Sequence, residues 1–274
     1  MTKISIIGLG WIGLPLAQLL QKSGQDVVGS TTSAQKLEKL KDQGVEAIHF
    51  SLVPFPQGLS FQKLFKSEVL VINIPPRTRS TDGKLYLEQL KFLRSIVDQS
   101  DIQKIIFVSS TGVYPNLNQE VAYSEEELIT TQTAGNIIQL KGEDSFKGDK
   151  ALTIVRFGGL LGDDRIPGKY VAGRENVNSN NRVNYIYRND AVRMLAWIIE
   201  KELWNEVYNG VAHLHPTRKE VYERNVLDLG LEPPKSYLKV SEGKDRLVSG
   251  NKIMKTGFEF DYPNPLDFPY SIES

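Results

Sequence analysis

Short apolar runs alternate with longer amphipathic segments through the first 157 residues of the chain. The apolar runs are rich in β-branched residues, as in strands that are buried on both faces of a parallel sheet. They predict strands at residues 3–7, 26–29, 45–50, 68–74, 104–110 and 152–157. The amphipathic segments predict helices at residues 11–22, 34–42, 83–99 and 124–146. Strands that alternate with helices indicate βαβ crossovers, so we expect an α/β fold with a Rossmann-type doubly wound parallel sheet.

The pattern loosens after residue 157. Residues 158–181 are rich in glycine, asparagine and charged residues, which is typical of a binding loop or a small lobe. Helical patterns return at residues 189–201 and 217–229. We therefore expect residues 1–157 to form the Rossmann core, and residues 158–274 to complete that core and to form a small C-terminal substrate lobe.

Three glycines lie between the first predicted strand and the first predicted helix. Gly8, Gly10 and Gly13 form the pattern G-x-G-x-x-G, with Trp11 and Ile12 inside it. In this position the first glycine permits a tight turn, the second lets the backbone approach a pyrophosphate, and the third lets helix and strand pack closely. The alternative is a glycine-rich turn that binds nothing. The five βα alternations that follow favour a dinucleotide site.

The end of the second strand usually selects the cofactor. An acidic residue there bonds the ribose hydroxyls of NAD and repels the 2'-phosphate of NADP. This chain has Ser30, Thr31, Thr32 and Ser33 at that place and no acid, with Lys36 one helical turn further on. We expect these residues to bind NADP, with NAD as the alternative. The same residues are also suited to cap the next helix, which is compatible with binding.

The segment "IIFVSSTGVYP", residues 105–115, resembles the strand end of extended short-chain dehydrogenases and sugar-nucleotide epimerases. The segments "VRFGGLLGDDRIPG" at 155–168 and "NYIYRNDAVRML" at 184–195 are similar to later parts of that family in order and spacing. In detail the chain is most similar to an atypical, YeeZ-like branch of this NAD-dependent epimerase/dehydratase-like family. Ligands in such sheets lie outside the carboxyl ends of the strands. We therefore expect the cofactor also to meet residues at those ends, namely Ile74, Pro75, Ser109, Phe157 and Gly158.

The resemblance implies a mechanism in which a serine holds the reacting oxygen and a tyrosine in Y-x-x-x-K transfers the proton. The serine corresponds to Ser110, and Thr111 beside it could substitute. The tyrosine and lysine are missing, because Gly135 and Gln139 occupy their places. If the protein is an enzyme, another tyrosine, Tyr114 or Tyr185, or a water molecule would supply the proton.

Three functions remain open on these grounds. The first is an oxidoreductase or epimerase of atypical mechanism. The second is a non-catalytic NADP-binding sensor or scaffold, which the missing pair favours. The third is a β-hydroxyacid-type dehydrogenase, whose N-terminus is also similar, but the strands predicted near Leu152 and Glu206 argue against the all-helical second domain that it requires.

The amino-acid composition excludes several classes of binding partner. Basic and acidic residues number 33 each, so no net field attracts nucleic acid or an anionic membrane. The chain has no cysteine, and its three histidines are not in metal-ligand spacing, so we expect no metal site. The first apolar run is too short for a leader or a membrane span, and we expect a cytoplasmic protein. The expected partner is a small-molecule substrate such as a nucleotide sugar or another phosphorylated carbonyl compound, which Arg77 and Arg79 could contact unless they only face solvent.

Overall fold

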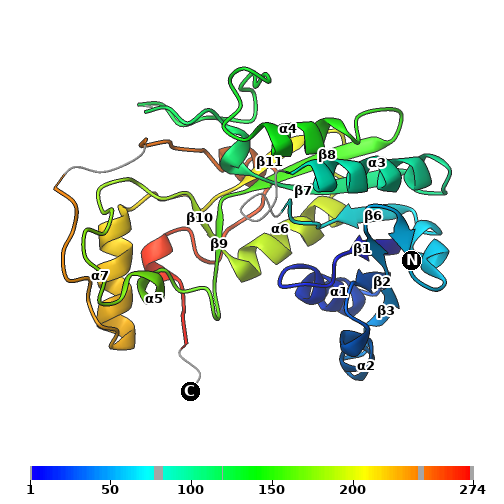
Figure 1. The fold of residues 1–274 in the computed structure, drawn as a ribbon, viewed down its shortest axis with the longest axis horizontal. Coiled ribbons are helices and arrows are strands. Elements are labelled where there is room, and N and C mark those ends of the chain that lie inside the picture. The colour runs from blue at the N-terminus through cyan, green and yellow to red at the C-terminus, as the bar shows by residue number, and fades with distance from the viewer. Residues whose placement is uncertain (1, 77–82, 119, 240–243, 272–274) are drawn as a thin grey trace. The chain divides into compact units, whose positions relative to one another are not determined.

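A seven-stranded sheet organises the protein in the computed structural model, which describes residues 2–76, 83–118, 120–239 and 244–271. The strand order is β11-β8-β7-β6-β1-β2-β3 (Figure 1). The pairs β1–β2, β1–β6, β2–β3 and β6–β7 are parallel. The strands are β1 (Lys3–Ile7), β2 (Asp26–Thr31), β3 (Glu46–His49), β6 (Val69–Ile72), β7 (Lys104–Ser110), β8 (Ala151–Phe157) and β11 (Val207–Gly210). The predicted doubly wound α/β fold is confirmed.

Helices connect these strands. The longer ones are α1 (Gly13–Lys22), α2 (Ala34–Asp42), α3 (Lys84–Asp98), α4 (Ile137–Asp144), α6 (Arg188–Glu200) and α7 (Arg218–Leu229). The shorter elements are β4 (Ser51–Leu52), β5 (Pro56–Gln57), η1 (Phe61–Phe65), η2 (Thr111–Val113), β9 (Gly159–Leu161), α5 (Pro167–Val171), β10 (Tyr185–Tyr187), α8 (Asn251–Met254) and η3 (Pro265–Asp267). Among the described residues no helix is long and apolar enough to span a membrane.

The chain divides into two compact units. Unit 1 consists of residues 1–113, 136–156 and 192–207, and unit 2 consists of residues 114–135, 157–191 and 208–274. The division expected from the sequence had one boundary, after residue 157. In the structure the chain also passes from unit 1 to unit 2 near this position, between residues 156 and 157. In addition, residues 114–135 belong to unit 2 and residues 192–207 belong to unit 1.

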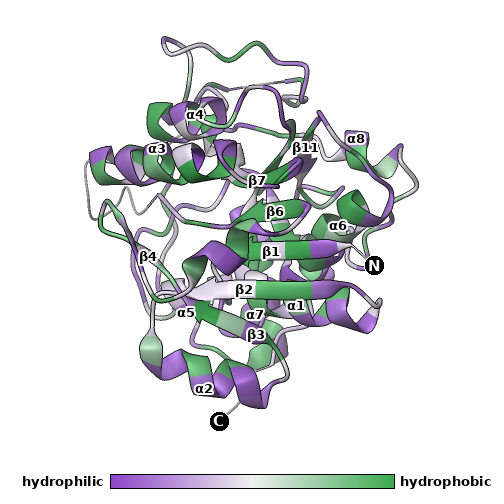
Figure 2. Cartoon of the chain, turned by 90° about the vertical axis from the view of Figure 1, so that its right-hand side faces the viewer, coloured by the Kyte–Doolittle hydropathy of each residue, from purple (hydrophilic) through white to green (hydrophobic). Residues whose placement is uncertain are grey.

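The core of unit 1 is built on the apolar strands that the sequence predicts. Strands β1 and β6 are coloured hydrophobic along most of their length in Figure 2, and every residue of β6 is buried. Helices α3 and α4 lie on one face of the sheet and α1 on the other (Figures 1 and 2). Leu90, Leu93 and Val97 of α3 pack with Phe107 of β7 and Phe146 in one buried cluster. The same cluster contains Ile7, Val28 and Ile72, so it also packs β1, β2 and β6.

The predicted helix at residues 124–146 is wrong in its first half. Helix α4 begins at Ile137, because the side chain of Asn136 accepts hydrogen bonds from the backbone N–H groups of Ile138 and Gln139 and so caps it. The preceding threonines instead form a turn, in which the hydroxyl of Thr130 accepts from the N–H of Thr133. Threonine hydroxyls that bond local backbone compete with helix formation. The adjacent pair Leu128 and Ile129 does not form an apolar helix face that would outweigh them.

Unit 2 has its own small core. Strands β9 and β10 pair in parallel, and Tyr187 of β10 packs against Tyr262 and Phe268 with ring centroids 4.8 and 5.3 Å apart. The fully buried carboxylate of Asp190 accepts hydrogen bonds from the backbone N–H groups of Asp261 and Tyr262. These contacts tie the C-terminal segment to the start of α6.

Candidate cofactor site

The three glycines of the first βα turn meet three different environments. Gly8 has a φ of +105°, and a Cβ on it would stand 2.6 Å from the carbonyl oxygen of Asn73. A Cβ on Gly13 would stand 2.1 Å from the carbonyl oxygen of Gly8, so this glycine permits close packing of helix on turn. A Cβ on Gly10 would meet nothing within 4 Å. The turn is therefore closed at its two ends and open at Gly10, as a pyrophosphate site requires.

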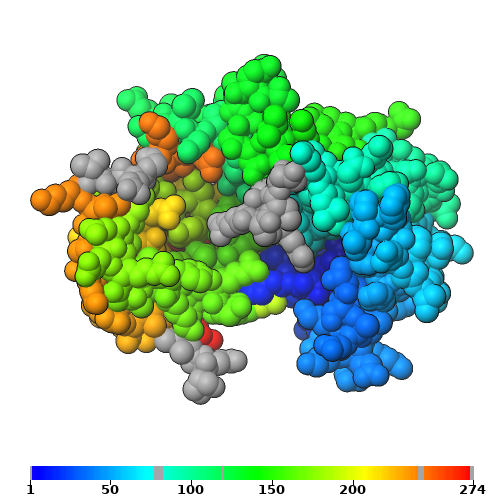
Figure 3. All heavy atoms as spheres, viewed as in Figure 1, coloured from blue at the N-terminus to red at the C-terminus, as the bar shows by residue number. Residues whose placement is uncertain are grey.

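Helix α1 begins at this opening. Its N-cap residue is Ile12, which makes no side-chain cap, and its first turn contains no acidic residue. The N–H groups of Leu14 and Leu16 donate to the carbonyls of Gly10 and Ile12, and Pro15 has no N–H. The feature that favours an anion at this end is therefore the helix dipole. In the space-filling view, dark blue atoms from the N-terminal end of the chain are visible at the surface (Figure 3).

Hydrogen bonds hold the turn against the neighbouring strand ends. The backbone N–H of Gly8 donates to the hydroxyl of Ser30, at 3.0 Å, and the side-chain amide of Asn73 donates to the carbonyl of Gly8, at 3.3 Å. Ser30 is buried, so its hydroxyl supports the turn rather than facing a ligand. Ser30 belongs to the site as a positioning residue.

The end of β2 presents hydroxyls and no carboxylate. The hydroxyl of Thr31 accepts from the N–H of Ser33, at 3.2 Å, and Thr32 is exposed. Ser33 is the N-cap residue of α2, but its side chain makes no cap hydrogen bond. A ring nitrogen of His49, from the end of β3, lies 3.2 Å from the carbonyl oxygen of Thr32. The sequence did not single out His49, although parallel pairing with β2 places it opposite Thr31.

Strand β6 ends beside the same edge. Ile74 is half-buried and packs against the core of unit 1, whereas Pro75 is exposed. Arg77 and Arg79 lie outside the described residues.

Strand β7 ends at Ser110, the predicted oxygen-holding serine. The hydroxyl of Ser110 is half-buried and accepts a hydrogen bond from the N–H of Gly112, at 3.0 Å, which leaves its proton to donate. Thr111 is buried, with 5% of its surface exposed, in the turn η2 that follows. Ser110 is thus the better placed of the two to meet a ligand.

Ser109 leads to a cluster that sequence reasoning missed. Its hydroxyl donates to Oε1 of Glu143, at 2.6 Å. Arg156 holds the same carboxylate from the other side, with Nε 3.0 Å from Oε1 and Nη2 2.7 Å from Oε2. Glu143 and Arg156 are almost fully buried. The hydroxyl of Ser109, predicted to contact cofactor, is therefore engaged within the protein. The available signal was a charged residue, Arg156, inside an otherwise apolar strand.

Of the two positions where the family has tyrosine and lysine, one lies outside helix α4 and the other lies on it. Gly135 is exposed and precedes the N-cap of α4, so it is not on the helix. Gln139 is in the first turn of α4, and its Oε1 is buried with no hydrogen-bond partner. A Cβ on Gly112 would stand 2.7 Å from this oxygen and 3.3 Å from the hydroxyl oxygen of Ser110.

The remaining predicted residues belong to unit 2. Tyr114 is fully buried, stacks on Tyr123 with centroids 5.3 Å apart, and donates its hydroxyl to Oδ1 of Asn209 at 2.9 Å. A hydroxyl enclosed and engaged in this way is unsuited to proton transfer, so we correct its assignment as a catalytic residue. Burial raises the pKa of Tyr185 to about 12, with an opposing effect from Arg218. That pKa makes Tyr185 a poor base near neutral pH.

Phe157 and Gly158 mark the end of β8 in the same unit. Phe157 is buried. A Cβ on Gly158 would stand 2.3 Å from the carbonyl oxygen of Asn184, and its N–H donates to the carbonyl of Gly210 at 3.0 Å. Packing therefore suffices to explain the glycine, and a contact with cofactor stays a prediction.

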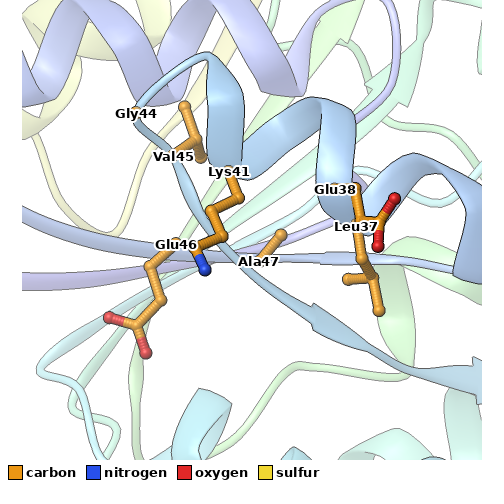
Figure 4. Close-up of a pocket in the computed structure, with 7 residues that line it drawn as sticks. All are labelled: Leu37, Glu38, Lys41, Gly44, Val45, Glu46 and Ala47. Atoms are coloured by element: carbon orange, nitrogen blue, oxygen red, sulfur yellow. The ribbon is translucent and has the colours of Figure 1, made fainter.

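One surface depression of about 520 Å³ lies between α2 and the edge strand β3. Its lining residues are Leu37, Glu38, Lys41, Gly44, Val45, Glu46 and Ala47 (Figure 4). None of the predicted site residues lines it. Within the described part of the chain no three histidine or acidic side chains gather as a metal site.

A known family matches this arrangement of strand, glycine turn and helix. The model of the UDP-glucose/GDP-mannose dehydrogenase family, NAD binding domain, matches residues 2–189. The chain belongs to this family. The match covers the glycine-rich turn, the end of β2 and the end of β7.

Relatives of this NAD-binding family member cover different shares of the chain. Protein YeeZ of Escherichia coli K12 is 29% identical over 272 residues, which are 98% of this chain and 99% of YeeZ. The UDP-N-acetyl-D-mannosamine dehydrogenase of Methanocaldococcus jannaschii is 29% identical over 121 residues, 40% of this chain and 28% of that enzyme. The resemblance to the YeeZ-like branch is thereby confirmed along the whole chain.

Solved structures share the fold. A UDP-glucuronic acid 4-epimerase of Bacillus cereus, in complex with UDP-glucuronic acid and NAD, has a TM-score of 0.73 at 18% identity and covers 99% of this chain and 95% of its own. The UDP-glucose 4-epimerase of Thermus thermophilus, in complex with NAD, has a TM-score of 0.74 at 15% identity, with 96% of each chain covered. This family member thus shares the fold of these two epimerases.

Proposed function

We propose that this NAD-binding family member is an NAD(P)-dependent oxidoreductase or epimerase of atypical mechanism that acts on a nucleotide sugar. The observation that carries the proposal is the opening at Gly10, between the closed contacts of Gly8 and Gly13 and in front of the uncapped start of α1. A pyrophosphate fits there because the backbone can approach it at Gly10 and the dipole of helix α1 favours an anion.

The residues at the end of β2 support a preference for NADP over NAD. Thr32 and Ser33 provide hydroxyls at the end of β2, and no carboxylate among residues 29–33 repels a phosphate. Ser33 leaves its hydroxyl outside the helix cap, where it can donate to a ligand. Adenosine ribose lies beside this strand end in Rossmann folds.

The chemistry requires few groups from the protein. A bound nicotinamide supplies hydride exchange. Ser110 would donate its hydroxyl proton to the reacting oxygen of the substrate and so hold that oxygen in place, while the N–H of Gly112 fixes the hydroxyl. Gln139 is neutral and does not lower the pKa of a neighbouring acid as lysine does. A missing acid–base pair commonly costs about 10²- to 10⁴-fold in rate, so we expect slow turnover.

The substrate class follows from what related folds bind. The Bacillus cereus structure holds UDP-glucuronic acid, and MoeE5 has been solved with UDP-glucose and NAD at a TM-score of 0.75 and 16% identity. The family model is also named for enzymes of nucleotide sugars. These names support a nucleotide sugar as the substrate of this chain.

The test is a calorimetric titration of the purified protein with NADPH and with NADH. We expect micromolar affinity and tighter binding of NADPH. The Gly10→Val variant should lose binding at least tenfold while it keeps the melting temperature of the parent, because its side chain enters open space. Absence of binding by the parent to either cofactor would refute the proposal. Retention of full affinity by Gly10→Val would refute the pyrophosphate contact.

A second candidate is a non-catalytic dinucleotide-binding sensor or scaffold. The position of Gly135 outside helix α4 favours it, because no side chain there can carry the missing hydroxyl. Two measurements separate the functions when the protein is mixed with oxidised cofactor and UDP-glucose or UDP-glucuronic acid. Absorbance at 340 nm rises if the sugar is oxidised and the cofactor reduced, and chromatography of the sugar detects an epimer that forms without a net change in absorbance. Tight cofactor binding without oxidation or epimerisation of either sugar would favour the sensor.

A further inference from the structure

The outer edge of strand β3 is open beside helix α2. Strand β3 is the last strand of the seven-stranded sheet and pairs with β2. Just after β3, the N–H of Phe50 donates to the carbonyl of Thr31, at 3.0 Å. Alternate residues of a strand bond to the same neighbour, so Ala47 and His49 direct their N–H and C=O groups away from β2. A Cβ on Gly58 would stand 2.1 Å from the carbonyl oxygen of His49, so the chain itself covers that group and Ala47 remains at the open part of the edge.

The surface depression between α2 and β3 lies at this open part. Figure 4 shows Leu37 of α2 and Ala47 of the strand among its apolar lining residues. Its charged lining residues are Glu38 and Lys41 of α2 and Glu46 at the start of β3, and all three are exposed. Within the part of the chain that the structure describes, none of these three side chains forms an ion pair. The edge therefore combines apolar surface with unpaired charges of both signs.

Charges of both signs on one helix face are complementary to a second copy of the same face. Glu38 and Lys41 are three residues apart, so they lie on one side of α2. A two-fold axis reverses the direction of the second helix, so that Glu38 of each copy can lie opposite the partner's Lys41. Both charges are then paired in both copies. A partner that carries charges of a single sign would neutralise only one of them.

The strand permits the same two-fold axis. In an antiparallel pair, two residues that lie opposite each other can exchange two N–H···O bonds. If Ala47 lies opposite the partner's Ala47, these bonds form at the open part of the edge. Glu46 then lies opposite the partner's Ile48 and not opposite another carboxylate. Because Glu38, Lys41 and Ala47 line one depression, a single axis serves the helix contact and the strand contact.

We propose that the depression between α2 and β3 is a contact between two copies of this chain, related by a two-fold axis at Ala47. The contact joins the two sheets through β3 and pairs Glu38 of each copy with the partner's Lys41. It involves few residues, and interfaces below about 1,200 Å² are typical of transient association. We therefore expect a dissociation constant of about 10–100 µM. The inference does not depend on a bound cofactor.

Sedimentation equilibrium of the full chain measures this association. Lys41→Glu places carboxylates opposite each other, and Glu38→Lys places ammonium groups opposite each other. Each variant should therefore associate about tenfold more weakly than the parent. A one-to-one mixture of the two variants restores opposite charges in both pairs, so it should form a mixed dimer as strong as that of the parent. Only a contact between copies can produce this recovery, because each chain in the mixture keeps its own altered charge.

The matched control is Lys39→Glu, because Lys39 is an exposed lysine of the same helix that is not part of the lining. It should leave the dissociation constant within about twofold of the parent. A parent that stays monomeric up to millimolar concentration would overturn the inference and leave an extended peptide as the occupant of the edge. A dimer that Lys41→Glu does not weaken would also overturn it, because the copies then meet elsewhere. So would a mixture that associates no more strongly than the two variants alone.

Discussion

Glu143 and Arg156 place two charges in the interior of unit 1. Both carboxylate oxygens have a donor from Arg156, and Oε1 has a second donor from Ser109. Removal of one charge from water is costly unless the group is paired and hydrogen-bonded, and here the pairing is complete. The pair links α4 and β8 to Ser109 near the end of strand β7, next to Ser110.

Glu143→Ala should therefore destabilise the protein strongly, by about 3–5 kcal/mol, because it leaves the Arg156 guanidinium buried without its partner. Urea denaturation followed by circular dichroism measures the change. Asp144→Ala is the matched control on the next residue of α4. Asp144 forms an exposed ion pair with Lys147, so its loss should cost less than about 1 kcal/mol. Equal costs for the two variants would show that the buried pair is not a structural anchor.

At the scale of elements, two helices start at residues whose side chains cap them. Helix α4 starts at the Asn136 cap, and α7 starts with a capping box in which Thr217 accepts from the N–H of Glu220 and the Glu220 carboxylate accepts from the N–H and hydroxyl of Thr217. The backbone and side-chain hydrogen bonds from Thr217 lower the pKa of Glu220 from its ordinary value of 4.5. The cap thus depends on the ionised carboxylate.

Thr217→Ala should destabilise α7 by about 1 kcal/mol at neutral pH. Because the folded-state pKa of Glu220 is depressed, the stabilisation is present above pH 4.5 and is lost as the pH falls through the lower folded-state value. The difference in melting temperature between the parent and Thr217→Ala should accordingly shrink below pH 4.5. A difference that stays constant from pH 7 to pH 3.5 would mean that the carboxylate contributes nothing to the cap.

The sequence predicted strands better than it predicted helix starts. Strands β1 and β6 are buried along most of their length, so a buried strand is the only structure that explains their apolar runs. The segment before α4 carries the apolar residues Leu128 and Ile129, but they are adjacent in the sequence and Leu128 is exposed. Its fold depends on local threonine hydrogen bonds, which hydrophobic periodicity does not record. The glycine-rich turn could be predicted because all of its residues lie in one short stretch of sequence. The contacts of Ser109 with Glu143 and of Gln139 with Gly112 could not, because they join residues that are distant in the sequence.

At the scale of the whole molecule, the dinucleotide should stabilise the folded chain by mass action. A ligand that binds only the native state at 100 times its dissociation constant adds about 2.7 kcal/mol to the free energy of unfolding. We expect NADPH at that concentration to raise the melting temperature by a few degrees. Gly10→Val should show no increase under the same conditions. An equal increase in both proteins would place the ligand elsewhere on the chain.

The open space at Gly10 has a practical consequence, because the chain contains no cysteine. A Gly10→Cys protein would carry a single thiol, at the mouth of the first helix, without any need to remove others. The rate at which a small maleimide reacts with that thiol would report how often the turn is covered. A dinucleotide seated on the turn would slow the labelling, so occupancy of this one position could be followed by mass spectrometry in mixtures where spectroscopy fails.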